Sequence, residues 1–91
     1  MSPQPTTSWC VYIIQSDDDL LYTGITNNLE RRWQAHLQQK GGAKFFRGRR
    51  PKQLLYVERG HDRASASQRE AAIKRMPRAK KLQLVASAQP D

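Results

Sequence analysis

One uninterrupted apolar segment, CVYII at residues 10–14, most constrains the fold of this sequence. A helix that crosses a membrane needs about 20 such residues, so this run does not predict one. Its β-branched and aromatic side chains favour a strand over residues 9–15. The acidic segment 16–19 favours a turn, and residues 20–25 repeat the strand composition. The sequence therefore predicts a β-hairpin, in which Gly24 marks a bulge or a close approach by another group.

Residues spaced four apart predict a helix after this hairpin. Leu29, Trp33 and Leu37 would form its apolar stripe. Asn27 is expected to cap the helix, with Glu30 as its capping-box partner three residues on.

The second half of the chain predicts one strand and two helices. Residues 53–59 have strand composition. Ser65 is expected to cap a second helix that stops before Pro77, and Pro77 to open a third helix. The inner face of that third helix is expected to carry Ala79, Leu82 and Val85. The order ββαβαα predicts an α+β domain, a three-stranded antiparallel sheet flanked by helices.

The length of 91 residues fits a single domain. We expect a flexible leader at 1–8, a folded domain at 9–86 and a flexible tail at 87–91. The leader has neither the basic start nor the apolar segment of a secretory signal. Cys10 is the only cysteine, which excludes an internal disulfide and a cysteine-based zinc finger and favours a reducing, cytoplasmic setting.

The formal net charge of +8 is concentrated in two segments. Residues 30–52 contain eight basic side chains against the single acid Glu30, and residues 69–81 contain six against Glu70. If folding brings these segments together, they would form a surface for a polyanion such as nucleic acid. The alternative is a merely soluble surface. An anionic membrane is not expected as a partner, because no basic helix has a long apolar face.

Four side chains of the hairpin and first helix are candidates for chemistry. With a three-residue loop at 16–18, Tyr12 and Tyr22 would lie directly across from each other on one face of the sheet. The alternative is an ordinary aromatic pair that stabilises the sheet. Arg32 and His36 lie one helical turn apart and are expected to border the core without entering it, or to form a solvated flank.

Glu70 is the candidate of the second helix. It lies four residues after Ala66 and three before Ile73, which places a carboxylate on the apolar stripe. An inward carboxylate needs a base, backbone donors or a metal as its partner. The alternative is an outward ion pair with Lys74.

In this order, the residues resemble a known family. The resemblance is to the GIY-YIG nuclease superfamily. It rests, in chain order, on Cys10-Val11-Tyr12, Tyr22-Thr23-Gly24, Asn28-Leu29 with Arg32 and His36, and finally Glu70. The segments PKQLLYVE, REAAIKRM and KKLQLV resemble its small stand-alone YhbQ-like group. The resemblance extends over about residues 9–86 and implies a small GIY-YIG-like domain.

The resemblance implies a nuclease that hydrolyses phosphodiester bonds with one divalent cation, Mg²⁺ or Mn²⁺. Glu70 would be the only protein ligand of the metal, and Arg32 would stabilise the charge of the transition state. Tyr22 and His36 would support the phosphate or assist the leaving oxygen. Tyr12 would accept the proton of the attacking water if Arg32 or the metal stabilised its phenolate; otherwise it would orient that water. All these groups are expected to converge in one cleft open to solvent.

The sequence departs from the family pattern at three points. Cys10 replaces the glycine of the first motif and Thr23 the isoleucine of the second. An asparagine that many members have near the end of the domain is missing, since the two asparagines are Asn27 and Asn28. We also expect no attached targeting module, so the chain would select its substrate by its basic loop or through a partner protein.

The basic side chains are expected to bind phosphates, which gives affinity without sequence preference. Phe45 or Phe46 would stack on an unpaired base or fill the core. We expect the substrate to be DNA rather than RNA, structured or single-stranded; the alternatives are a non-catalytic nucleic-acid-binding module and a basic adaptor to an acidic protein. The expected contacts are Lys44, Arg47, Arg49, Arg50, Lys52 and Lys74.

Overall fold

The computed structural model describes residues 8–38 and 48–88. It confirms the α+β class and the order ββαβαα. Most of the expected leader and tail, and the loop residues Lys44, Phe45, Phe46 and Arg47, lie outside the described residues. The elements are β1 (Trp9–Ser16), β2 (Leu21–Thr26), α1 (Leu29–Gln38), β3 (Pro51–His61), α2 (Arg63–Lys74) and α3 (Arg78–Ala88).

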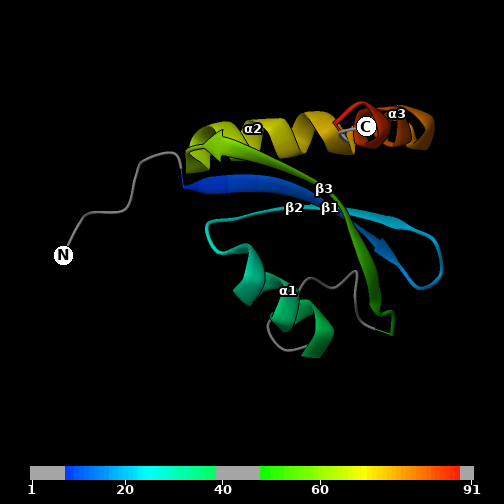
Figure 1. Ribbon diagram of the computed structural model, residues 1–91. Coiled ribbons are helices and arrows are strands. Elements are labelled where there is room, and N and C mark those ends of the chain that lie inside the picture. Colours follow the sequence, from blue (N-terminus) through cyan, green and yellow to red (C-terminus); the bar gives the residue numbers. More distant parts are fainter. Residues whose placement is uncertain (1–7, 39–47, 89–91) are drawn as a thin grey trace.

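The three strands form one antiparallel sheet in the order β2-β1-β3. Helix α1 lies on one face of this sheet, and helices α2 and α3 lie on the other (Figure 1). The central strand β1 is thus covered on both faces, which explains why residues 10–14 are apolar without alternation. No helix in the described part of the chain is long and apolar enough to span a membrane.

Each face of the sheet has its own apolar cluster. On the α2 and α3 face, Val11 and Ile13 pack with Ala66, Ile73 and Val85. On the α1 face, Tyr12 and Ile14 are the buried residues, and the partly buried residues packed on them are Tyr22, Leu29, Trp33 and Val57. Alternate residues of β1 therefore belong to different clusters, as expected of a pleated strand.

The hairpin register differs from the prediction by two residues. Tyr12 lies opposite Gly24 and Tyr22 lies opposite Ile14, so the two tyrosines are diagonal neighbours on the same face. The turn closes at Ser16, whose N–H donates to the carbonyl of Leu20 at 2.9 Å. The loop has the expected three residues, but it lies one position later, at 17–19. A shift of two residues preserves the face that each side chain occupies.

Both predicted N-caps are wrong by a few residues. Asn28, not Asn27, caps α1, because its Oδ1 accepts from the N–H of Arg31 at 3.1 Å. Asp62, not Ser65, caps α2: its Oδ1 accepts from the N–H of Ser65 at 2.7 Å. Ser65 completes the capping box from the third helical position.

The apolar stripes of two helices are only partly as predicted. Helix α3 begins at Arg78, one residue after Pro77. Its Val85 is buried, but Ala79 and Leu82 are exposed and Leu84 packs on the core instead. In α1, Leu37 is also exposed. A helical repeat of 3.6 residues drifts away from fixed steps of three or four, which explains these differences.

Candidate active site

Two tyrosines of the hairpin meet over a glycine on the α1 face. Tyr12 is fully buried, Tyr22 is half-buried, and their ring centroids are 6.1 Å apart. A Cβ atom on Gly24 would lie only 2.5 Å from the hydroxyl oxygen of Tyr12 and 2.9 Å from Cε2 of Tyr22. The predicted close approach at Gly24 is therefore made by these rings, and no larger residue fits there without displacing them.

His36 enters the core beside these rings. It is fully buried, and its Nε2 lies 3.0 Å from the hydroxyl oxygen of Tyr12. Its ring is also edge-on to Tyr22, at 5.5 Å between centroids. The expectation that His36 would only border the core is therefore wrong; the phenol of Tyr12 supplies the hydrogen-bond partner that a buried imidazole requires.

The titration of Tyr12 and His36 follows from their burial. Burial raises the pKa of Tyr12 well above its usual value, although hydrogen bonding to Arg32 opposes that shift. Burial, together with the charge of Arg32, lowers the pKa of His36 to about 4. At neutral pH both groups are uncharged, and the hydroxyl of Tyr12 shares a hydrogen bond with Nε2 of His36. This geometry favours an orienting role for Tyr12 over the role of general base.

Arg32 lies at the partly exposed rim of the same cluster. Its side chain is hydrogen-bonded to Tyr12 and Tyr22, and the bond to Tyr12 contributes most to raising the pKa of the guanidinium. Like Tyr22, Arg32 is half-buried, whereas Tyr12 and His36 are fully buried. The structure thus brings together four of the predicted residues. The expected open cleft is wrong for the two buried ones, and a ligand can meet only Arg32 and Tyr22 directly.

Glu70 lies on α2, across the sheet from these four residues. Ala66 and Ile73 form the buried seam of α2, and residues 69 and 70 flank this seam on its two sides. Since Arg69 contacts Glu58 on β3, Glu70 faces the other outer strand, β2. The Glu70 side chain is 22% exposed, and its Oε2 lies 3.6 Å from Nζ of Lys74. The Glu70 carboxylate is thus partly buried, as one sequence alternative expected, and it forms the ion pair with Lys74 that the other expected. The convergence of Glu70 with Tyr22 and Arg32 stays a prediction.

The acidic hairpin loop holds arginines from both basic segments. Oδ2 of Asp18 lies 2.7 Å from Nε of Arg49, and Nη1 of Arg78 donates to the carbonyl of Asp19 at 2.7 Å. The two basic segments therefore meet at the tip of the hairpin. Lys52 and Lys74 are exposed.

Comparison with known proteins supports the same reading of the motifs. A family model described as the GIY-YIG catalytic domain matches residues 8–83. The chain belongs to the GIY-YIG family. GIY-YIG domains form a family of nucleases, which is the coarse functional assignment that this membership carries.

Relatives of this GIY-YIG chain are UPF0213 proteins, which confirms the predicted YhbQ-like group. One from Desulfotalea psychrophila is 45% identical over 82 residues, covering 90% of this chain and 74% of the relative. One from Oceanobacillus iheyensis is 49% identical over 75 residues, covering 82% and 86%. The solution NMR structure of a UPF0213 protein from Bacillus halodurans has a TM-score of 0.56 at 36% identity, covering 88% of this chain and 84% of that one.

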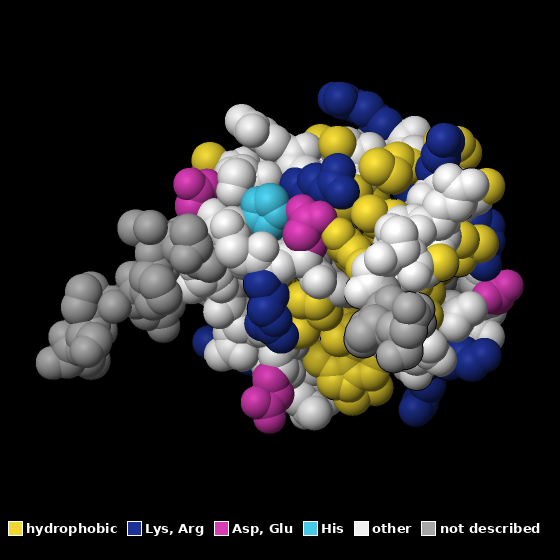
Figure 2. Space-filling model, turned by 45° about the horizontal axis from the view of Figure 1, so that its top comes forward, with side chains coloured by type: hydrophobic (Ala, Val, Ile, Leu, Met, Phe, Trp, Pro, Cys, Tyr) yellow, Lys and Arg dark blue, Asp and Glu magenta, His cyan; other side chains and the backbone are white. Residues whose placement is uncertain are grey.

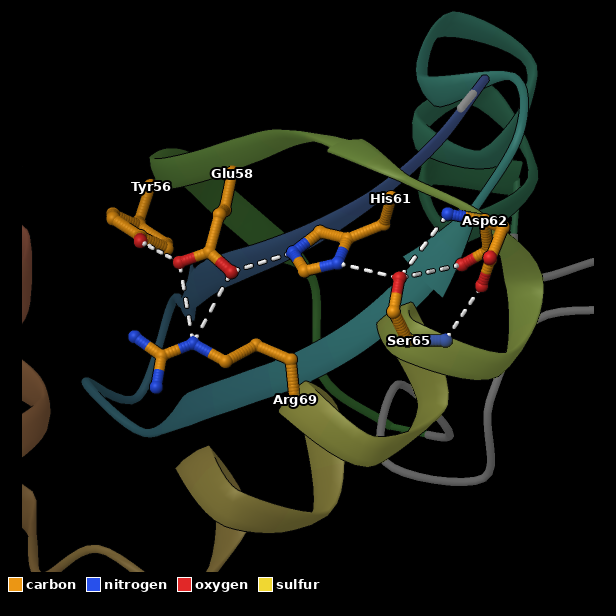
Figure 3. Close-up of polar contacts among 6 residues, drawn as sticks. All are labelled: Tyr56, Glu58, His61, Asp62, Ser65 and Arg69. Carbon is orange, nitrogen blue, oxygen red and sulfur yellow. Dashed lines mark hydrogen bonds and ion pairs between the residues drawn. The ribbon is translucent and has the colours of Figure 1, made fainter. Parts of the chain in front are cut away.

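A second polar cluster of this GIY-YIG domain escaped the sequence analysis. Tyr56, Glu58, His61, Ser65 and Arg69 form a connected set of hydrogen bonds between β3 and α2 (Figure 3). Figure 2 looks onto the side of the molecule that carries α2 and α3, and it shows a histidine next to an acidic side chain there. Tyr56 and Glu58 are two residues apart on a strand and so share a face, which is the signal that could have indicated the cluster.

Proposed function

We propose that this protein is an endonuclease that hydrolyses phosphodiester bonds of DNA with Mg²⁺ or Mn²⁺. One observation carries the proposal: in a GIY-YIG chain, the guanidinium of Arg32 is hydrogen-bonded to the two motif tyrosines at a partly exposed rim. A fixed cation beside neutral phenols suits the negative charge that a phosphoryl group develops during hydrolysis.

Each residue of the cluster has a distinct role in this proposal. Arg32 binds two phosphate oxygens through its planar donor set. Tyr22, half-buried beside it, orients the attacking water or the phosphate. Tyr12 and His36 lie beneath them, and their hydrogen bond of 3.0 Å holds the phenol that contacts Arg32. A second water then accepts the proton of the attacking water, because the raised pKa of Tyr12 keeps its phenol protonated.

Glu70 fits the role of a single metal ligand. No group of three or more His, Cys, Asp and Glu side chains that could hold a metal occurs among residues 8–38 and 48–88. Mg²⁺ is often held by one or two carboxylates plus waters and phosphate oxygens, which a partly exposed Glu70 permits. When bound, such a cation supplies Lewis-acid stabilisation of the phosphate charge. For Glu70 to act with Arg32, the substrate phosphate must lie at the β2 edge, between the two faces of the sheet.

The basic side chains would grip the DNA backbone on either side of that point. Three of these side chains lie just before or at the start of β3: Arg49, Arg50 and Lys52. Lys74 lies on α2, one helical turn from Glu70. Such contacts are independent of base sequence, so we propose selectivity for structured or single-stranded DNA, or for a site chosen by a partner protein.

The test is an incubation of nicked, branched and single-stranded DNA with Mg²⁺ or Mn²⁺. We expect cleavage by the natural sequence and at least about a hundredfold slower cleavage by Glu70→Gln. The matched control is Glu30→Gln, an exposed carboxamide substitution on α1. Equal rates for the natural sequence and Glu70→Gln, or no cleavage of any substrate, would contradict the proposal.

The second candidate is a nucleic-acid-binding module without catalysis. The observation that favours it is the position of Lys74, whose Nζ is 3.6 Å from the carboxylate that would hold the metal. In that case DNA would bind with strong salt dependence and without requiring Mg²⁺, and Glu70→Gln would bind as the natural sequence does.

A further inference from the structure

The carboxylate of Glu58 is the centre of the polar cluster between β3 and α2. It accepts hydrogen bonds from the Tyr56 hydroxyl at 2.5 Å and from Nε of Arg69, at 3.1 Å to Oε1 and 3.2 Å to Oε2. Nε2 of His61 lies 2.6 Å from the same group (Figure 3). Burial alone would raise the pKa of Glu58, but Tyr56, His61 and Arg69 together hold it below its usual value. The Glu58 carboxylate is therefore charged and tied on several sides.

This carboxylate attaches helix α2 to β3 at two points. Arg69 is the first. The second is Ser65, whose Oγ lies 2.9 Å from Nδ1 of His61, on the other side of the imidazole from Glu58. The attachments lie four residues apart, about one turn of helix. These two attachments restrain rotation of α2 about its axis. Packing of the buried seam restrains it less, because Ala66 has a small side chain.

The chain of Glu58, His61 and Ser65 resembles a hydrolytic triad, but its geometry serves another purpose. Oγ of Ser65 accepts from the N–H of Asp62 at 3.2 Å and completes the capping box of α2. The hydroxyl is thereby fixed at a helix start rather than presented to a substrate. The cluster holds the helix instead of forming a second reaction centre.

Rotation of α2 decides where Glu70 points. Residues 69 and 70 lie about 100° apart around the helix axis, on opposite sides of the seam of Ala66 and Ile73. When Arg69 is held on β3, Glu70 is on the side of β2. A rotation by one position would carry Glu70 away from the β2 edge.

We infer that the Glu58–Arg69 ion pair is a positioning device that fixes the rotation of α2 and so directs the Glu70 carboxylate toward β2. The role of Glu70 as metal ligand rests on the proposed function; the orientation of the helix does not. Glu58 and Arg69 are positioning residues and touch neither metal nor substrate.

The experiment compares three variants with the natural sequence by NMR, without metal, well below their unfolding temperatures. Arg69→Gln breaks the ion pair. Arg75→Gln removes the same charge from the exposed C-cap of α2, and Tyr56→Phe removes a hydrogen bond to Glu58 while the ion pair stays. We expect amide shifts of β2 to change in Arg69→Gln and to stay as in the natural sequence in the two controls. Unchanged β2 shifts in Arg69→Gln, or equal changes in Arg75→Gln, would overturn the inference.

The second arm adds Mn²⁺ and follows the paramagnetic broadening of amide signals near Glu70. We expect Arg69→Gln to bind Mn²⁺ roughly tenfold more weakly, as for other residues that orient a metal ligand. Loss of a nearby cation alone would strengthen binding, so the expected change is opposite in sign to the simple effect of charge. Equal or tighter binding by a folded Arg69→Gln would overturn the inference. Broadening absent from the natural sequence would contradict the role of Glu70, while the metal-free shifts would still decide the orientation of α2.

Discussion

At the scale of single residues, Gly24 and His36 decide the shape of the tyrosine cluster. Gly24 could be singled out from the sequence, since a glycine inside a strand indicates a close approach. The burial of His36 could not, because it depends on a partner 24 residues away on another element. Helical spacing placed His36 beside the seam, and the hydrogen bond with the hydroxyl of Tyr12 offsets part of the cost of burying its imidazole.

A methyl group at position 24 should destabilise the domain. In Gly24→Ala, the new Cβ would lie 2.5 Å from the Tyr12 hydroxyl oxygen, so the ring must move. We expect a loss of about 2–3 kcal/mol in the free energy of unfolding, measured by urea denaturation. The control is Gly60→Ala, where φ is +85° and the added Cβ would meet no side chain or backbone atom within 4 Å. This substitution should lower the free energy of unfolding by about 1 kcal/mol and leave the tyrosine cluster intact. A Gly24→Ala variant as stable as the natural sequence would contradict the packing.

The burial of His36 should make stability depend on pH in a defined window. Its pKa is about 4 in the folded protein and about 6.5 in an unfolded chain, so between these values only the unfolded state takes up a proton. Stability should therefore fall as pH decreases from 6.5 to 4, by roughly 2–3 kcal/mol from this group. Urea denaturation across this range should show a smaller fall in His36→Gln. Parallel curves for the two proteins would show that His36 titrates normally.

At the scale of elements, the pattern of apolar residues predicted each helix and strand among residues 8–38 and 48–88, but not their ends or register. The hairpin loop is the clearest case: three aspartates in succession left the turn free to begin at residue 16 or 17. The structure places Asp19 at φ 66°, a left-handed residue that closes the loop at 17–19. The Glu58–Arg69 ion pair could not be predicted from the apolar pattern either, because its partners are 11 residues apart on a strand and a helix.

The two asparagines before α1 should differ in their effect on stability. Asn28 accepts the hydrogen bond from the N–H of Arg31 and so caps the helix that carries Arg32. Asn28→Ala should cost about 1 kcal/mol, and Asn27→Ala less than about 0.5 kcal/mol. Thermal unfolding followed by circular dichroism would measure both. A larger loss for Asn27→Ala would instead support the cap that the sequence suggested.

At the scale of the whole molecule, the sheet separates the two halves of the proposed site. The cluster of Tyr12, Tyr22, Arg32 and His36 lies on the α1 face, and Glu70 lies on the α2 face. The family motifs indicated which residues to examine, but only the strand order places β2 as the shared boundary. We therefore propose that the substrate phosphate lies at the β2 edge.

The charge of the molecule should govern DNA affinity through salt. Each contact that a basic side chain forms with a phosphate releases a counterion from the DNA. Each such contact contributes about −0.7 to −0.9 to the slope of log affinity against log salt. Lys52→Ala should weaken binding uniformly across DNA sequences and reduce that slope by about one contact. Fluorescence anisotropy between 50 and 200 mM salt, an interval of about fourfold, would measure this. Arg59→Ala, an exposed arginine further along β3, is the control; an equal effect there would indicate a diffuse charge effect rather than a defined path.

The central claim, that Arg32 stabilises a phosphoryl group beside the two tyrosines, is tested most directly by single-turnover cleavage of DNA with Mn²⁺. Arg32→Lys keeps the charge but loses the planar donor set that contacts both phenols. Arg31→Lys makes the same change at the exposed neighbouring position of α1. We predict a cleavage rate roughly a hundredfold lower for Arg32→Lys and unchanged for Arg31→Lys. Equal rates for the two variants would contradict the account.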